Sequence, residues 1–222
     1  MNNYTKNQLE YWHDKKHGKR RTPDHPIVKL YVCSKIEFIC TLIELGKNIL
    51  DVGAGNGYFS KHFNDIVPTT AIDYSSVMLK ENPVPDKKVM DACLLDLPDK
   101  SFDTVFCHAV LHHIAPSDQP KVIQEMSRVA RRQIVIIEPN RNNPIMAAFG
   151  ILKKEERESL KFSKNYLKKL VENSGISVTY ACSYGLLTPN RMPIPKCVLP
   201  VFKFFERPLP LGVTNIIIAR VS

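Results

Sequence analysis

The sequence lacks several features that would place it in a special class of protein. It has no apolar run of the about 18 residues that a helix needs to cross a bilayer. Its first 26 residues are polar and basic, unlike the apolar centre of a secretory signal peptide. Internal repeats and low-complexity tracts are also absent. These absences predict a globular protein that resides in the cytoplasm.

The cysteines form no pattern that is typical of metal binding or of disulfides. None of the six has C-x-x-C spacing, and four lie in apolar runs, where free cysteine behaves as a small buried hydrophobe. They are Cys33, Cys40, Cys93, Cys107, Cys182 and Cys197. We therefore expect neither a metal site nor a disulfide framework, as is usual in a reducing cytosol.

Size and charge set further limits. A chain of 222 residues with 44% hydrophobic residues is long enough for one α/β domain with a full core. The net charge is +9, with basic clusters at 15–21 and between 153 and 169. Such a surplus either solvates the surface or favours an anionic partner, which could be a phospholipid surface, a phosphorylated substrate or nucleic acid.

The most informative segment is 48–60, in which glycines follow an apolar run that ends at Asp51. This order predicts a strand, a tight turn and a helix. Glycines allow positive φ and close approach of a ligand, and the amides that begin a helix attract anionic groups. A dinucleotide-binding turn would need Gly or Ala three residues after Gly55, where the bulky Tyr58 stands.

The pattern Asp51-x-Gly53-x-Gly55-x-Gly57 resembles motif I of the class I S-adenosylmethionine-dependent methyltransferases. Two further short strands end in acids, Asp73 and Asp91, the first about 20 residues beyond the turn. Segments 101–114 and 133–139 resemble the fourth and fifth strands of that family. The order and spacing match over 47–140, and more weakly up to 184.

The resemblance and the alternation of strands with helices predict an α/β fold. We expect a doubly wound, Rossmann-like sheet of seven mostly parallel strands, with the last strand antiparallel beside the fifth. The expected strands are 48–52, 69–73, 88–92, 102–107, 133–138, 176–183 and 213–219. The expected helices are 3–17, 26–45, 57–65, a short one from 75, 117–130, 144–161 and 163–175. Residues 1–46 would form a helical lid segment and 47–222 the methyltransferase domain, with 188–211 as a substrate-side insertion.

The resemblance also implies the cofactor, S-adenosylmethionine (SAM), with S-adenosylhomocysteine as the product. Asp73 would accept hydrogen bonds from the ribose, Asp91 would lie by the adenine, and Asp51 would approach the ammonium group. Tyr74 and Met78 could enclose the adenine or simply fill the core. The complete set of expected cofactor residues is Asp51, Gly53, Ala54, Gly55, Gly57, Asp73, Tyr74, Met78, Asp91, Ala92 and Cys107.

The end of the fourth strand would lie nearest the transferred methyl group. His108 and His112 are the catalytic candidates there, because histidine suits general-base work near neutral pH. His112 and His113 point about 100° apart on a helical turn, so at most one of them can face the acceptor. The pair could instead order the turn by hydrogen bonding. Glu138 and Asn140 are candidates for positioning the acceptor.

Two regions should decide the acceptor. One is the N-terminal segment with Tyr4, Tyr11, Trp12 and Arg21, which folds over the cofactor in many members of the resembled family. The other is 188–211, which is rich in proline and large apolar residues and could form an amphipathic helix over 196–207. Phe202 and Phe205 would share one face of that helix. The segment could be a plain connection against the core, an apolar wall for a lipid-like acceptor, or a contact with a membrane surface.

These observations favour a methyltransferase that acts on a small molecule, preferably a lipid or isoprenoid-like acceptor, with possible peripheral contact to an anionic membrane. An RNA (tRNA or rRNA) methyltransferase is the first alternative. No Asn/Asp-Pro-Pro-Tyr/Phe motif follows the fourth strand, however, and aromatic residues do not interleave with the basic clusters. A cofactor-binding, non-catalytic partner subunit is the second alternative, against which the intact glycines and acids count.

Overall fold

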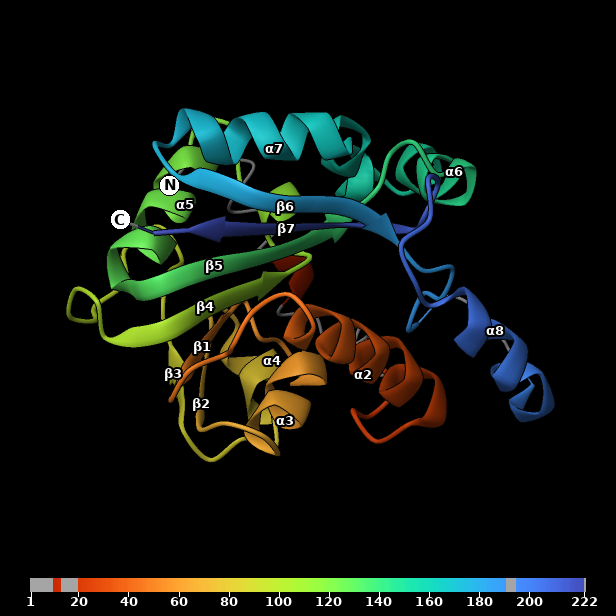
Figure 1. Ribbon diagram of the computed structural model, residues 1–222, viewed down its shortest axis with the longest axis horizontal. Coiled ribbons are helices and arrows are strands. Elements are labelled where there is room, and N and C mark those ends of the chain that lie inside the picture. Colours follow the sequence, from red (N-terminus) through yellow and green to blue (C-terminus); the bar gives the residue numbers. More distant parts are fainter. Residues whose placement is uncertain (1–9, 13–19, 191–194, 222) are drawn as a thin grey trace.

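The computed structural model describes residues 10–12, 20–190 and 195–221. Its centre is a seven-stranded sheet in the order β3-β2-β1-β4-β5-β7-β6, in which only β7 is antiparallel (Figure 1). The strands are β1 (Ile49–Val52), β2 (Thr69–Asp73), β3 (Lys87–Val89), β4 (Phe102–His108), β5 (Ala130–Pro139), β6 (Ser177–Tyr184) and β7 (Thr214–Arg220). This arrangement confirms the predicted fold, including the antiparallel last strand beside β5.

Helices cover both faces of the sheet. They are α2 (Pro26–Cys40), α3 (Tyr58–Asn64), α4 (Ser76–Lys80), α5 (Gln119–Val129), α6 (Pro144–Leu152), α7 (Lys164–Asn173) and α8 (Leu199–Phe205). The described residues also include the short 3₁₀ helices η2 (Leu111–His113), η3 (Lys154–Lys161) and η4 (Lys196–Val198). The helices α5 and α7 pack on one face, and α2 and α3 pack on the other (Figure 1).

The central strands are apolar on both sides because each face is covered by helices. In β4, Val105 and Cys107 join the core beneath α5 and α7, whereas Phe106 joins the core beneath α2 and α3. The strand order reverses between β1 and β4, so the connections that leave their adjacent carboxyl ends turn to opposite faces of the sheet. Ligands of open α/β sheets bind at such a point.

Several elements differ from the sequence-based expectation. The strand expected at 88–92 ends at Val89, because the Asp91 side chain accepts a hydrogen bond from the Cys93 amide and turns the chain. The helix expected at 144–161 divides into α6 and η3, since Lys153 has an extended backbone. The helix expected at 26–45 ends at Cys40. Of the helix expected at 3–17, the structure describes only 10–12, which are helical.

The helix α2 belongs to the core rather than to a lid. It begins at Pro26 after the His25 cap, and its buried residues are Ile27, Val28, Tyr31, Val32, Lys35, Ile36 and Ile39. A lid can therefore involve only residues that precede Pro26, and it stays a prediction.

A buried ion pair attaches the segment that carries α8. Glu206 accepts a hydrogen bond from the Lys35 ammonium at 2.8 Å and from the amides of Leu186 and Leu187 at 2.9 and 2.8 Å. Burial lowers the pKa of Lys35, although Glu206 opposes this. Breaking such a pair leaves an uncompensated charge in the interior. The helix α8 itself has no fully buried residue and projects away from the sheet (Figure 1). Among the described residues, no helix is long and apolar enough to cross a membrane.

Candidate active site

A cavity of about 540 Å³ lies at the carboxyl ends of the parallel strands. Its wall draws on β1, β2, β4 and β5, on the loops that follow them, and on residues as distant in sequence as Trp12 and Thr214. The cavity lies where the elements that carry most of the predicted site residues meet. The end of the cavity near β1 and β2 is called the cofactor end. The end near η2, η3 and α6 is called the acceptor end.

Two of the three glycines in the turn after β1 line the cofactor end. Gly53 and Gly55 have φ of +69° and +52°, and the Ala54 between them also lines the cavity. A Cβ on Gly53 would lie 2.3 Å from a methyl group of Val110. Gly57 does not line the cavity but caps α3 with φ of +88°. The first two glycines therefore allow the left-handed turn that lines the cavity, with Val110 packed closely on Gly53, and the third starts the helix.

Asp73 holds the glycine turn against the end of β2. Its carboxylate accepts hydrogen bonds from the amides of Gly55 and Ser75, at 2.8 and 2.7 Å. Asp73, Tyr74 and Met78 line the cavity, with Tyr74 39% exposed and Met78 buried. Asp91 and Ala92 line it from the loop after β3. The structure thus brings these five predicted residues to one cavity.

Asp51 lies at the end of β1 and is almost completely buried beneath the cavity. Burial raises the pKa of its carboxyl group to about 7, while the hydrogen bond from the Ser60 hydroxyl, at 2.5 Å, opposes the shift. The nearby Asp73 carboxylate raises the pKa further. An arriving cation would stabilise the ionised form of Asp51, so this position favours a positively charged ligand group.

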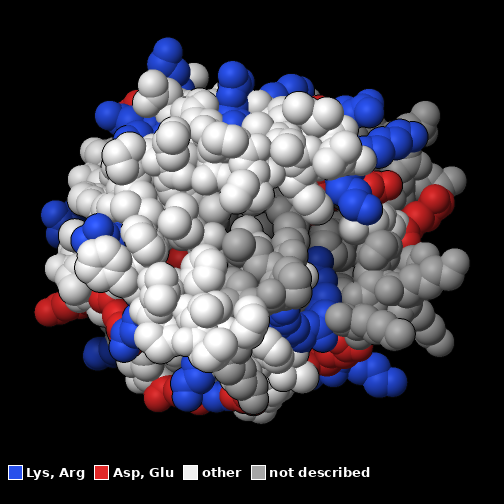
Figure 2. Space-filling model, turned by 90° about the vertical axis from the view of Figure 1, so that its right-hand side faces the viewer, with Lys and Arg blue, Asp and Glu red and all other residues white. Residues whose placement is uncertain are grey.

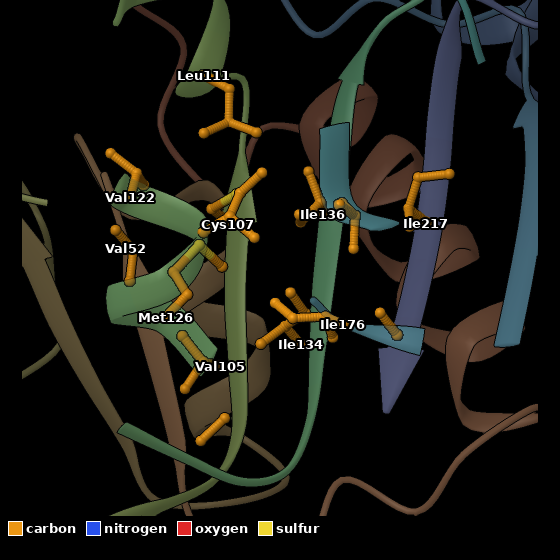
Figure 3. Close-up of a cluster of buried hydrophobic side chains, with 14 of the residues drawn as sticks. Val52, Val105, Cys107, Leu111, Val122, Met126, Ile134, Ile136, Ile176 and Ile217 are labelled. Carbon is orange, nitrogen blue, oxygen red and sulfur yellow. The ribbon is translucent and has the colours of Figure 1, made fainter. Parts of the chain in front are cut away.

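Cys107, like Gly57, was expected to contact the cofactor but lies outside the cavity wall. Its side chain does not line the cavity but lies in the core among Val105, Met126 and Ile136 (Figure 3). Side chains alternate along a strand, so it is the next residue, His108, that faces the cavity. Burial raises the pKa of the Cys107 thiol well above its ordinary value.

His108 is buried in an aromatic environment at the end of β4. Its Nε2 lies 2.8 Å from the Tyr31 hydroxyl, and its ring packs on Phe59 with centroids 4.7 Å apart. Burial lowers the pKa of His108 to about 3, and the positive charges of Lys35, His112 and Arg20 act in the same direction. The imidazole is therefore neutral at pH 7. A group with so low a pKa is a weak general base.

His112 lies in the opposite electrostatic environment. Its Nδ1 is 2.6 Å from Glu138 Oε2, and its Nε2 is 3.4 Å from Glu156 Oε2. Burial disfavours the charge, but the two carboxylates raise the pKa of His112 to about 9. The other oxygen of Glu138 accepts hydrogen bonds from the amides of Val110 and Leu111. This arrangement corresponds to the interpretation in which the histidine orders the turn.

Several residues that were predicted to contact the acceptor lie outside the cavity wall. Asn140 does not line the cavity, since its amide donates to the Gly212 carbonyl before β7 and to the Ser183 hydroxyl of β6. Phe202 and Phe205 do not line it either, because they lie on the projecting α8, where Phe202 packs on the core beside α2. Glu138 lies beneath the cavity wall rather than in it.

The N-terminal candidates lie around the acceptor end. Trp12 lines the cavity, and Tyr11 contacts its ring edge-to-face with centroids 5.0 Å apart. Arg21 donates a hydrogen bond to the Pro189 carbonyl at 2.6 Å. Tyr4 lies outside the described residues.

Sequence reasoning missed several residues of the acceptor end. Tyr31, Met146, Glu156 and Thr188 all line the cavity, and no motif marks any of them. Thr188 is 7% exposed, and its hydroxyl has no hydrogen-bond partner among the described residues. A buried hydroxyl without a partner is unfavourable, so its position in the wall indicates a ligand contact.

Solved structures share this fold at low sequence identity. A SAM-dependent methyltransferase from Thermotoga maritima, described as a possible histamine N-methyltransferase, gives a TM-score of 0.68 at 15% identity and covers 88% of this chain and 91% of its own. The magnesium protoporphyrin IX methyltransferase of Synechocystis, solved with SAM bound, gives 0.66 at 14% identity and covers 100% and 99%. The chain therefore has the fold of the class I SAM-dependent methyltransferases.

Sequence comparisons identify the domain more closely. Residues 50–137 match the family described as "Methyltransferase domain". The phosphatidylethanolamine N-methyltransferase of Cereibacter sphaeroides is 35% identical over 104 residues, which cover 41% of this chain and 50% of that protein. An uncharacterised methyltransferase of Schizosaccharomyces pombe is 34% identical over 97 residues, covering 37% and 35%. These matches thus span half or less of each relative's length.

SAM is the cofactor of this class, and the residues of the cofactor end fit it. The positive φ of Gly53 and Gly55 leaves space where a Cβ would otherwise stand. Asp73 has the position to bind ribose hydroxyls, and Asp51 the position to bind an ammonium group. When bound, SAM supplies an activated methyl group.

Proposed function

We propose that the protein transfers the methyl group of SAM to a lipid acceptor at an anionic membrane surface. The observation that carries this proposal is an apolar face beside the acceptor end of the cavity. Its members are exposed large apolar residues of α6, α8 and their flanking loops. They are Ile145, Ile151, Leu152, Val201, Phe204 and Leu211, which are 52–80% exposed.

The apolar face lies on the side of the molecule where α6 and α8 project (Figure 1). Seen from that side, uncharged residues occupy most of the surface, a hollow lies near its centre, and many Lys and Arg side chains stand toward its edge (Figure 2). Large apolar groups exposed together mark a surface that is covered in function. Amphipathic helices bind membranes in this way, with the apolar side in the interface.

Basic side chains adjoin the apolar face. Lys153 and Lys154 directly follow α6, and Lys203 and Arg207 lie on and after α8, all of them exposed. The Arg207 guanidinium lies 4.3 Å from the centre of the Phe204 ring. Each basic residue near an anionic leaflet contributes about 1 kcal/mol of attraction. The combination therefore favours anionic lipid over a purely apolar partner.

The apolar face continues into the cavity. Met146 of α6 and the segment 187–190, which precedes α8, belong to the cavity wall. A lipid headgroup that enters from this face would meet Thr188 and then the end of β4. The similarity to a phosphatidylethanolamine N-methyltransferase over the central domain supports an acceptor of this kind.

In this proposal the chain's own residues bind and orient the reactants. The SAM methyl group is already activated, so alignment of the acceptor with it captures much of the rate gain. His108, neutral and hydrogen bonded to Tyr31, shapes the wall near the methyl group. An amine acceptor would arrive deprotonated or lose its proton to solvent, because the pKa of His108, about 3, is too low and that of His112, about 9, is too high for general-base work near neutral pH.

Transfer of labelled methyl from SAM would be measured in parallel with phosphatidylethanolamine–phosphatidylglycerol vesicles, extracted isoprenoid lipids and total RNA. We expect label in a lipid fraction and co-sedimentation with anionic vesicles. The double variant Val201→Ser/Phe204→Ser should lower both by at least about tenfold with little change in stability, because exposed substitutions usually shift it by less than about 0.5 kcal/mol.

Ile66→Ser is the matched control, since Ile66 is 59% exposed beside α3 and outside the apolar face. Label in RNA alone would replace the lipid proposal with the RNA alternative. SAM binding without transfer to any fraction would favour a non-catalytic partner subunit. An equal effect of the control variant would show that the apolar face has no special role.

A further inference from the structure

We propose that His112, His113 and Glu156 form a binding site for a divalent transition-metal ion, such as Zn²⁺, at the acceptor end of the cavity. One ligand atom from each of the three residues lies within 4.8 Å of the others. The histidines come from η2 after β4, and the glutamate comes from η3, which packs against it. All three residues line the cavity.

The separation of the ligand atoms suits an ion. His112 Nε2 and Glu156 Oε2 are 3.4 Å apart. A charge-assisted hydrogen bond between such groups is usually about 2.7–2.9 Å long. Two ligands that each lie about 2.0–2.1 Å from a tetrahedral ion are separated by about 3.3 Å. The observed spacing is thus closer to that of a shared ion than to that of a direct bond.

A buried carboxylate supports the first ligand from behind. Glu138 Oε2 is 2.6 Å from His112 Nδ1, and Glu138 Oε1 is fixed by the amides of Val110 and Leu111 at 2.9 and 2.7 Å. Metal-binding histidines generally donate their second ring N–H to a carboxylate, which fixes the tautomer and aims the other nitrogen at the ion. Glu138 and His112 have this relationship, and the second ring nitrogen, Nε2, lies on the side of Glu156.

Two imidazoles and one carboxylate select a class of ion. This donor set suits Zn²⁺ and neighbouring divalent ions such as Co²⁺ and Fe²⁺, and is less suited to Ca²⁺ or Mg²⁺, which prefer oxygen ligands. Three protein ligands leave at least one coordination position open, and the cavity lies on that side. An oxygen of the acceptor, in a hydroxyl or a phosphate group, would fill it. The ion would therefore orient the acceptor.

The single tryptophan offers a direct readout. Trp12 contacts the His113 ring edge-to-face, with centroids 5.0 Å apart. Metal-free protein would be titrated with Zn²⁺ in a calorimeter and with Co²⁺ while tryptophan emission and visible absorption are followed. We expect one ion per chain with a Kd below about 10 µM, quenching of Trp12 by Co²⁺, and no thiolate-to-cobalt charge-transfer band.

Variants separate the proposed site from adventitious binding. His113→Gln and Glu156→Gln should each weaken Zn²⁺ binding by more than about 100-fold, and Glu138→Gln by about 10- to 100-fold, the range for partners of metal ligands. Glu158→Gln is the matched control on the same 3₁₀ helix, where Glu158 pairs with Lys161 at 2.7 Å. It should leave Zn²⁺ affinity unchanged.

SAM affinity, measured for every variant, reports whether the fold is intact. Equal Zn²⁺ affinity in the ligand variants and the control, or a thiolate band from the free cysteines, would overturn the site. So would the absence of binding to wild-type protein that still binds SAM. Because these measurements need no acceptor, they are independent of the lipid proposal.

Discussion

The two ends of the cavity are built in different ways. The cofactor end takes its residues from one stretch, Asp51 to Ala92, in which strand ends and tight turns place backbone amides and acids. The acceptor end combines Trp12, Met146, Glu156 and Thr188, which come from four separate segments. The first end therefore depends on local backbone geometry. The second depends on long-range packing, such as the Lys35–Glu206 ion pair that anchors the segment carrying Thr188.

The largest effect should follow from a Cβ at Gly53, which would displace the Val110 side chain in the cavity wall. Gly53→Ala would place Cβ 2.3 Å from Val110 in a backbone with φ of +69°. We expect SAM affinity to fall by at least about 100-fold in calorimetry, because the clash adds to a left-handed strain of about 1–2 kcal/mol. Gly175→Ala is the control, since it has φ of +84° but no atom within 4 Å of the added Cβ. It should lower stability and leave SAM affinity unchanged, and an equal loss of affinity would contradict the clash.

A smaller loss should follow from removing the predicted ribose acceptor. Asp73→Ala deletes a carboxylate that lines the cavity and holds the Gly55 amide at 2.8 Å. Hydrogen bonds to charged groups contribute about 1.5–3 kcal/mol, so SAM affinity should fall roughly 10- to 150-fold. Asp91→Ala, at an exposed position, should have a smaller effect. Unchanged affinity in Asp73→Ala would refute the assignment of this residue.

The affinity of the cofactor end for SAM should also depend on pH through Asp51. Its pKa of about 7 in the unliganded protein means that the carboxyl group is largely protonated below pH 7. A cationic ligand requires the ionised form, so affinity should weaken as pH falls below 7, by up to about tenfold per unit. Titrations between pH 5 and 8 would show this slope. Asp51→Asn should flatten it, and the same slope in that variant would assign the dependence to another group.

The contrast between the two ends also explains what the sequence could predict. The strand at 69–73 and the glycine turn were predicted correctly because each depends on neighbouring residues. Asp91 was expected within a strand but lies in a loop, because its side chain turns the chain through the Cys93 amide. Cys107 was assigned to the cofactor, but strand alternation directs it to the core.

The acceptor end could not be predicted in this way. Thr188 and Glu156 carry no motif, and their approach to β4 is decided by α6, η3 and the Glu206 anchor. The amphipathic pattern at 196–207 did indicate a helix, yet the structure directs Val201 and Phe204 to solvent and leaves Phe202 and Phe205 outside the cavity. Periodicity alone does not determine which partner an apolar face meets.

His108 allows a test of chemistry at the border between the two ends. A general base would lose about 10²–10⁴-fold in turnover when removed. Because burial lowers the pKa of His108 to about 3, we expect His108→Ala to lower turnover by less than about tenfold, with SAM affinity intact. Steady-state rates between pH 5 and 8 would decide. A larger loss, accompanied by the disappearance of the acidic limb from the pH profile of kcat, would restore His108 as a base.

The smallest effect is expected at Thr188. Removing its hydroxyl should raise the stability of the protein but weaken its binding of the acceptor. Thr188→Val keeps the shape of the side chain and removes a buried hydroxyl that has no partner among the described residues. Without acceptor, the variant should be slightly more stable, because an unsatisfied buried polar group is costly. With acceptor, it should lose a hydrogen bond of about 0.5–1.5 kcal/mol, which raises KM for the acceptor by roughly 2- to 12-fold. Thermal unfolding measures the change in stability and steady-state kinetics measures the change in KM, while SAM affinity should not change.

A Thr188→Ser variant keeps the hydroxyl and should retain the wild-type KM. If Thr188→Val lowers stability and leaves KM unchanged, the hydroxyl serves the fold, and the acceptor end must bind its ligand through other groups.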